Sequence, residues 1–148
     1  MDAADEPNFS ILKSNYTTDP TNIHQCTMHF PNTCAIRMSE ALVKTDASFL
    51  DVFKQSSRNK CAHSYIRGAQ DLASILAQPS VFGPRSYGWA GGGNNAAPSN
   101  AKGIQGIICF MSIPGFSGQG HIDLWDKEYA VGSSYWNAQT IWLWELRL

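Results

Sequence analysis

The sequence predicts an α+β fold, because helical patterns fill the first half of the chain and strand patterns fill the last third. Apolar residues recur at three- and four-residue steps before residue 80, as in amphipathic helices. β-branched and aromatic residues form short runs after residue 103, separated by glycine and proline. The chain of 148 residues is long enough to bury a core, so we expect one domain over 1–148.

The N-terminal part of the chain predicts a short helix followed by a longer one. Turn-forming residues are frequent within 1–30, and a short helix there would be anchored to the core by Phe9, Ile11, Leu12 and Tyr16. A second helix is predicted over 34–44, where one face is apolar. Asn32 or Thr33 marks its start, since both residue types favour the N-cap position.

Two more helices and a long loop are predicted before the strands. Residues 47–55 are expected to form a short helix. The clearest amphipathic pattern covers 64–78, and Pro79 ends it. Residues 83–103 are rich in Gly, Pro and Asn and predict a loop of a length that is usually functional or mobile. This loop lacks the spacing of a phosphate-binding glycine motif.

Four strands are predicted after this loop, and strands that follow helices in this way are typical of the antiparallel sheet of an α+β fold. The run over 104–113 is apolar and β-branched, and Pro114 and Gly115 end it. The next strands are expected over 121–125 and 140–146, with a shorter one between residues 129 and 136. The sequence therefore predicts N-terminal helices that pack on a C-terminal antiparallel sheet.

Charge and hydropathy exclude several classes of partner. The net charge is −1 and basic residues do not cluster, so the sequence offers no argument for a nucleic-acid or anionic-membrane partner. No apolar run approaches the roughly 20 residues that span a bilayer, so membrane insertion is not expected. The acidic N-terminus lacks an apolar stretch, so we expect no signal peptide and a protein made in the cytoplasm.

The four cysteines are Cys26, Cys34, Cys61 and Cys109, and sequence alone cannot pair them. Because a chain of this length does not need cross-links, free thiols are expected, with one disulfide if the compartment is oxidising. Cys109 falls within an apolar run and is expected in the core.

The N-terminal histidines and cysteines allow a different function. His24, Cys26, His29 and Cys34 have the residue types of a zinc site. Their spacing lacks the paired CxxC or HxxxH units of structural zinc sites. A non-catalytic, zinc-stabilised binding module is therefore kept as an alternative to an enzyme.

A cysteine at a predicted helix start and a histidine at a predicted strand start suggest nucleophilic catalysis. The N-terminal end of a helix favours a thiolate at Cys34, and a nearby imidazole such as His121 can accept its proton. Asp123 projects to the same face of the strand as His121 and can orient its ring. The alternatives are a buried, unreactive Cys34 and a solvated Asp123.

Two segments around these residues resemble a known family. Residues 32–39 read Asn-Thr-Cys-Ala-Ile-Arg-Met-Ser, and residues 120–125 read Gly-His-Ile-Asp-Leu-Trp. They resemble, in the same order, the nucleophile motif and the Gly-His-x-x-Leu-Trp motif of type VI secretion amidase effectors of the Tae4 family. The resemblance covers most of the chain, although only these two motifs are specific.

The resemblance implies a papain-like fold of the NlpC/P60 type and a peptidoglycan amidase that needs no cofactor or metal. Cys34 would be the nucleophile and His121 the base. The bond cut would join γ-D-glutamate to meso-diaminopimelate, and a cut at the diaminopimelate–D-alanine cross-link is the alternative. The protein would pass through the type VI system from the cytoplasm into the periplasm of a target cell, and a cognate immunity protein would protect the producer.

The resemblance also implies a third acidic or polar residue on the strand after the histidine. At the expected place this chain has Gly132, Ser133 and Ser134. Asp123, Asp126 and the two serine hydroxyls therefore remain candidates. We select Asp123, because it shares a strand face with the histidine.

Overall fold

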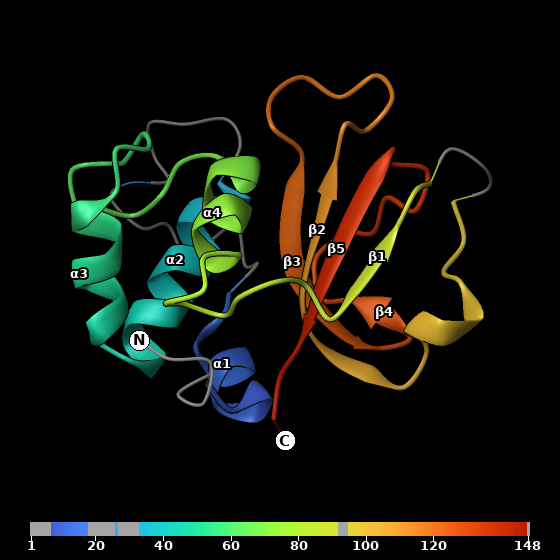
Figure 1. The fold of residues 1–148 in the computed structure, drawn as a ribbon, viewed down its shortest axis with the longest axis horizontal. Coiled ribbons are helices and arrows are strands. Elements are labelled where there is room, and N and C mark those ends of the chain that lie inside the picture. The colour runs from blue at the N-terminus through green and yellow to red at the C-terminus, as the bar shows by residue number, and fades with distance from the viewer. Residues whose placement is uncertain (1–6, 18–25, 27–32, 92–94, 148) are drawn as a thin grey trace.

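A computed structural model describes residues 7–17, 26, 33–91 and 95–147, which form a layer of helices against a five-stranded sheet (Figure 1). The strand order is β1-β5-β2-β3-β4, and every neighbouring pair is antiparallel. The α+β class that the sequence predicts is confirmed. None of the helices in the described ranges is long and apolar enough to cross a membrane.

The helices are α1 (Phe9–Asn15), α2 (Cys34–Thr45), α3 (Ser48–Gln55) and α4 (Ala69–Leu76). The start of α1 is capped by the Asn8 side chain, which accepts hydrogen bonds from two backbone N–H groups of the first turn. The short N-terminal helix and the helices expected over 34–44 and 47–55 are thus confirmed, with boundaries that differ by a residue.

The helix expected over 64–78 is too long at both ends, since α4 covers only Ala69–Leu76. The Ile66 N–H donates to the Ser39 hydroxyl at 3.1 Å, and the Tyr65 carbonyl accepts from the Cys61 N–H at 2.9 Å. These backbone groups are therefore unavailable to a helix. Ile66 is fully buried all the same, so it extends the apolar pattern without being helical.

The strands are β1 (Tyr87–Trp89), β2 (Ile104–Met111), β3 (His121–Lys127), β4 (Tyr129–Ala130) and β5 (Thr140–Glu145). The last four match the four predicted strands. β1 is a correction, because it lies inside the segment that was expected to be a loop throughout. Its three residues, Tyr-Gly-Trp, are too few to show a strand period, and pairing with β5 supplies the stabilisation that they lack by themselves.

The sheet separates two apolar clusters, and β2 contributes to both. Ile107, Cys109 and Met111 belong to the larger cluster, which the four helices cover. Ile108 and Phe110 belong to the second cluster, which includes Trp125 and Trp136. The buried face of α2 contributes Ala35, Met38, Ala41 and Leu42 to the larger cluster, so burial of apolar surface fixes this helix and its first residue beside the sheet.

One disulfide is present, between Cys26 and Cys61, so the expectation of free thiols is wrong for this pair. These residues are 35 positions apart, and both pack against Ile36 of α2. Cys34 and Cys109 lie outside this disulfide and are thiols. Sequence could not select the pair, because only tertiary packing against Ile36 brings the two sulfur atoms together.

The disulfide also counts against the zinc-stabilised module. A sulfur atom in a disulfide is not a thiolate, so Cys26 cannot serve as a zinc ligand in this structure. His24 and His29 lie outside the described residues. Within the part of the chain that is described, no group of three His, Cys, Asp or Glu side chains could hold a metal ion.

Candidate active site

Cys34 is the first residue of α2 and lies at the wall of a cavity. Its side chain is buried, with 8% of the residue exposed, and its Sγ lies 4.0 Å from the carbonyl oxygen of Gly120. Thr33, one of the two residues expected at the N-cap, occupies that position, but its side chain does not cap the helix. The positive end of the helix dipole therefore lies next to the thiol.

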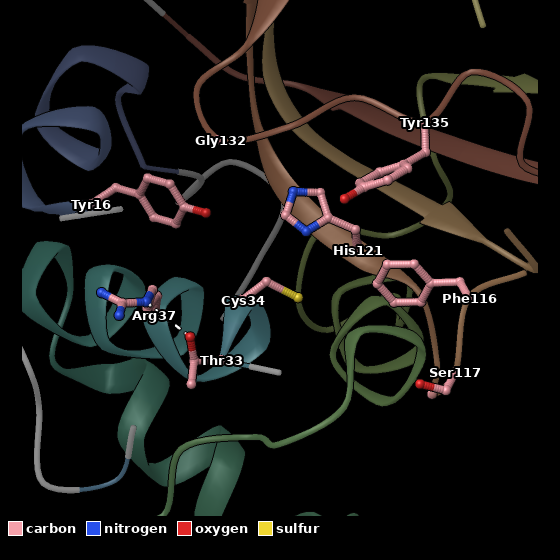
Figure 2. A pocket seen from close by; sticks show the side chains of 10 residues that line it. Tyr16, Thr33, Cys34, Arg37, Phe116, Ser117, His121, Gly132 and Tyr135 are labelled. Atoms are coloured by element: carbon pink, nitrogen blue, oxygen red, sulfur yellow. Dashed lines mark hydrogen bonds between the residues drawn. The ribbon is translucent and has the colours of Figure 1, made fainter. Parts of the chain in front are cut away.

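His121 is the first residue of β3, and Figure 2 shows the Cys34 side chain pointing toward its ring. Burial lowers the pKa of His121, but hydrogen bonds with the side chains of Asp123 and Cys34, and the charges of both, outweigh burial and raise this pKa to about 9. An imidazole with this pKa is protonated at neutral pH.

Asp123 is fully buried and forms a hydrogen bond with Nε2 of the His121 ring, at 2.7 Å from Asp123 Oδ2. The same oxygen accepts hydrogen bonds from the backbone N–H groups of Gly132 and Ser133, each at 2.9 Å. Oδ1 accepts from the Leu124 N–H at 2.8 Å. These donors compensate the burial of the carboxylate and fix its position.

The other candidates for a third residue lie elsewhere. Asp126 accepts hydrogen bonds from Lys13 at 2.6 Å and from Gln105 at 2.8 Å. Ser133 contributes its backbone N–H to the carboxylate of Asp123. Among the described residues, no hydrogen bond joins Ser134 to the histidine. Asp123, which was selected for its place on the strand face, is therefore the carboxylate that contacts the imidazole.

A cavity of about 600 Å³ opens over this cysteine and histidine (Figure 2). The segments that line it are the residue after α1, the start of α2, the β2–β3 loop, the start of β3 and the β4–β5 loop. The lining residues are Tyr16, Thr33, Cys34, Arg37, Phe116, Ser117, Gly118, His121, Gly132 and Tyr135. The volume falls within the range of roughly 300–1,000 Å³ that is typical of ligand pockets.

Two tyrosines of this cavity were not predicted as site residues. Tyr16 packs against the larger apolar cluster, as expected, and its hydroxyl also points into the cavity from the opposite side to Tyr135 (Figure 2). Burial, the Asp123 carboxylate and Cys34 raise the pKa of Tyr16 well above its usual value, so the hydroxyl remains a donor. Tyr135 contacts the His121 ring edge-to-face, with centroids 5.4 Å apart. No local pattern marks either residue.

Arg37 also lines the cavity, and its place in the sequence contains a signal that could have identified it. It lies three residues after Cys34 on the same helix, and side chains at this spacing share a helix face. The expected site included only residues that can act as a nucleophile, a base or the partner of a base, and an arginine is none of these.

A family model described as type VI secretion system (T6SS), amidase effector protein 4, named Tae4, matches residues 30–144. Among solved structures, Tae4 of Salmonella Typhimurium in a Tae4–Tai4 effector–immunity complex is 23% identical, with a TM-score of 0.73. That alignment covers 96% of this chain and 99% of the other. Tae4 of Enterobacter cloacae is 18% identical, with a TM-score of 0.69 and coverages of 95% and 97%.

The structural likeness shows a shared fold, and the family match shows membership. A search of curated proteins finds no match. The family model nevertheless spans most of the chain and includes both the Cys34 motif and the His121 motif. The chain therefore belongs to the Tae4 family of type VI secretion amidase effectors.

Proposed function

We propose that this protein is a cysteine amidase that hydrolyses the γ-D-glutamyl–meso-diaminopimelate bond of peptidoglycan stem peptides. The observation that carries the proposal is the convergence of Cys34, His121 and Asp123 at one cavity. A thiol at a helix start, an imidazole beside it and a carboxylate behind the imidazole are the parts of a nucleophile activated by a base. Family membership supplies the amide bond as the target.

In the proposed reaction, His121 holds the proton of Cys34, and the thiolate attacks the carbonyl carbon of the scissile amide. Backbone N–H groups at the start of α2 stabilise the negative oxygen that forms. The C–N bond breaks, His121 gives its proton to the leaving amine, and a thioester remains on Cys34. Water then attacks the thioester while His121 accepts a proton, and the carboxylic acid product leaves.

Asp123 is proposed to act through His121 rather than on the substrate. Its hydrogen bond to Nε2 leaves the other ring nitrogen for the thiol and stabilises the imidazolium. The nucleophile on a helix that packs against an antiparallel sheet is the arrangement expected of a papain-like, NlpC/P60-type domain. We propose that residues 1–148 act as one such domain.

The setting of the reaction is proposed from the family. The Tae4 relatives of known structure are described as type VI effectors and form complexes with the immunity protein Tai4. We propose that this protein is antibacterial, is delivered by a type VI system from the cytoplasm of the producer into the periplasm of a target cell, and is blocked by a cognate immunity protein.

The test is digestion of diaminopimelate-type sacculi by wild type, Cys34→Ala and the matched control Cys109→Ala, with products identified by mass spectrometry. We expect wild type and Cys109→Ala to release fragments that end at γ-D-glutamate, and Cys34→Ala to release none. Fragments cut at the diaminopimelate–D-alanine cross-link would favour the alternative bond. Turnover by folded Cys34→Ala would refute the cysteine mechanism.

A further inference from the structure

Arg37 places a fixed positive charge in the wall of the cavity that holds Cys34. A guanidinium remains protonated at every physiological pH. The described residues that line this cavity include no aspartate or glutamate, so no acidic side chain of the wall offsets this charge. A ligand group of negative charge would therefore meet this cation without competition from an acidic side chain among these lining residues.

Neutral groups orient the guanidinium without neutralising it. Its Nε donates a hydrogen bond to the Thr33 hydroxyl at 3.0 Å, and its Nη1 lies 3.5 Å from the Thr17 carbonyl oxygen (Figure 2 draws the first bond). No ion pair found among the described residues involves Arg37. A half-buried cation held in this way gains from a carboxylate that accepts its remaining N–H donors.

The position of Arg37 relative to Cys34 indicates which carboxylate of the substrate it can bind. Side chains three residues apart on a helix are neighbours, with Cβ atoms roughly 5–6 Å apart. A γ-linked glutamyl residue carries a free α-carboxylate on the same residue as its scissile side-chain carbonyl, with a short carbon chain between the two groups. With the carbonyl at Cys34, that carboxylate lies on the acyl side of the scissile bond, and Arg37 is a cation in the wall of the same cavity.

We propose that Arg37 binds the free α-carboxylate of the γ-D-glutamyl residue and so determines which acyl group the enzyme accepts. The inference rests on the proposed function, because it assumes that Cys34 attacks the γ-carbonyl. It makes a prediction that the catalytic assignment alone does not make. The enzyme should discriminate between γ-D-glutamate and γ-D-isoglutamine, in which an amide replaces the α-carboxylate.

A purely structural role for Arg37 makes a different prediction. Its contacts with Thr17 and Thr33 join the segment after α1 to the start of α2. Loss of such a link would slow the cleavage of every substrate by a similar factor. The ratio of kcat/KM between the two substrates therefore separates carboxylate recognition from support of the fold.

The experiment uses two synthetic peptides, L-Ala-γ-D-Glu-meso-diaminopimelate and its γ-D-isoglutamine counterpart. Wild type, Arg37→Gln and Arg37→Lys are compared, and Arg85→Gln is the matched control because Arg85 is exposed and lies over the Trp142 ring, outside the cavity lining. We expect wild type and Arg85→Gln to prefer the carboxylate peptide by about 10- to 100-fold. Arg37→Gln should bring the ratio close to one, and Arg37→Lys should give an intermediate ratio.

Sacculus digestion by wild type, run in parallel, distinguishes the failure of this inference from failure of the proposed function. If wild type cleaves sacculi at γ-D-glutamate but shows no preference between the peptides, the inference is wrong and the proposed function stands. An unchanged ratio in folded Arg37→Gln, with both rates reduced, would also overturn it in favour of a structural role. If wild type cleaves neither sacculi nor peptides, both proposals are wrong.

Discussion

The two cysteines outside the disulfide lie in opposite kinds of environment. Cys34 begins a helix, borders a cavity and lies beside a protonated imidazole. Cys109 lies within β2, is fully buried, and its Sγ lies 3.7 Å from the carbonyl oxygen of Ala69. Burial raises the pKa of the Cys109 thiol well above its usual value, and the nearby Cys34 adds to the effect.

This contrast shows that the residue type decides little about the chemistry of a thiol. A thiolate needs a partner that stabilises its charge, and a substrate needs a path to it. The region around Cys34 offers both, whereas the interior of the sheet offers neither. Four predictions test the contrast, from the largest expected effect to the smallest.

The strongest test removes the thiol group from Cys34 or from Cys109 by substitution with alanine. Cys34→Ala should lower kcat/KM for the stem peptide by at least about 10⁴-fold, because it removes the proposed nucleophile. Cys109→Ala should keep activity within a few-fold and lower the free energy of unfolding by about 1 kcal/mol. Peptide turnover and urea unfolding of both variants measure these effects. A large loss of activity in folded Cys109→Ala would show that the two cysteines do not differ in this way.

The second test removes the charge behind the imidazole. Asp123→Asn should lower kcat by about 10²- to 10⁴-fold, because the ring loses its orientation and the imidazolium loses its counter-charge. The pKa of His121, followed by NMR, should fall, since the Asp123 side chain raises it in wild type. A structural defect alone would lower activity and leave that pKa unchanged.

The third test concerns Cys26 and Cys61, which form the disulfide. Cys26→Ser combined with Cys61→Ser should lower the free energy of unfolding by about 2–4 kcal/mol, because the disulfide closes a loop with a sequence separation of 35 residues. A thiol reductant should destabilise wild type and Cys109→Ala but not the double variant. Equal stability of wild type with and without reductant would show that the disulfide contributes nothing.

The smallest expected effect is a dependence of stability on pH. The folded-state pKa of His121 is about 9, above its ordinary value of 6.5, so its stabilising contribution is complete below about pH 6.5. It is lost as the pH rises through about 9. Between pH 6.5 and 8 the free energy of unfolding should fall by on the order of 1 kcal/mol.

Two variants test whether this pH dependence of stability comes from the region around Cys34 and His121 or from the region around Cys109. His121→Gln should flatten the stability curve between pH 6.5 and 8, because its side chain does not titrate. Cys109→Ala should keep the slope in this range, because a thiol of raised pKa affects stability only near and above its ordinary pKa, about 9. Urea unfolding at several pH values measures the slope, and a slope retained in His121→Gln would assign it to another group.

Much of the fold and part of the site could be predicted from sequence, because they depend on local pattern. The period of apolar residues located α2, α3 and four of the five strands. The alternation of side chains along a strand was sufficient to select Asp123 as the neighbour of His121. These inferences hold because helix and strand geometry fixes the relation between residues that are close in sequence.

Errors arose where distant segments decide the local conformation. The backbone at Ile66 is extended, because Ser39 and neighbouring residues use its hydrogen-bonding groups. β1 exists because β5 pairs with it, and Cys26 pairs with Cys61 where both pack against Ile36 of α2. Sequence patterns contain no direct record of such contacts.

The sequence by itself determined the α+β class, the helix that begins at Cys34, the strand that begins at His121 and membership of the Tae4 family. Only the tertiary structure decided what surrounds the thiol. Tyr16 and Tyr135 reach the same cavity from segments far apart in the chain, and backbone donors from the β4–β5 loop hold the Asp123 carboxylate. Local periodicity fixes which face a side chain occupies, whereas a catalytic cavity forms only where several faces meet.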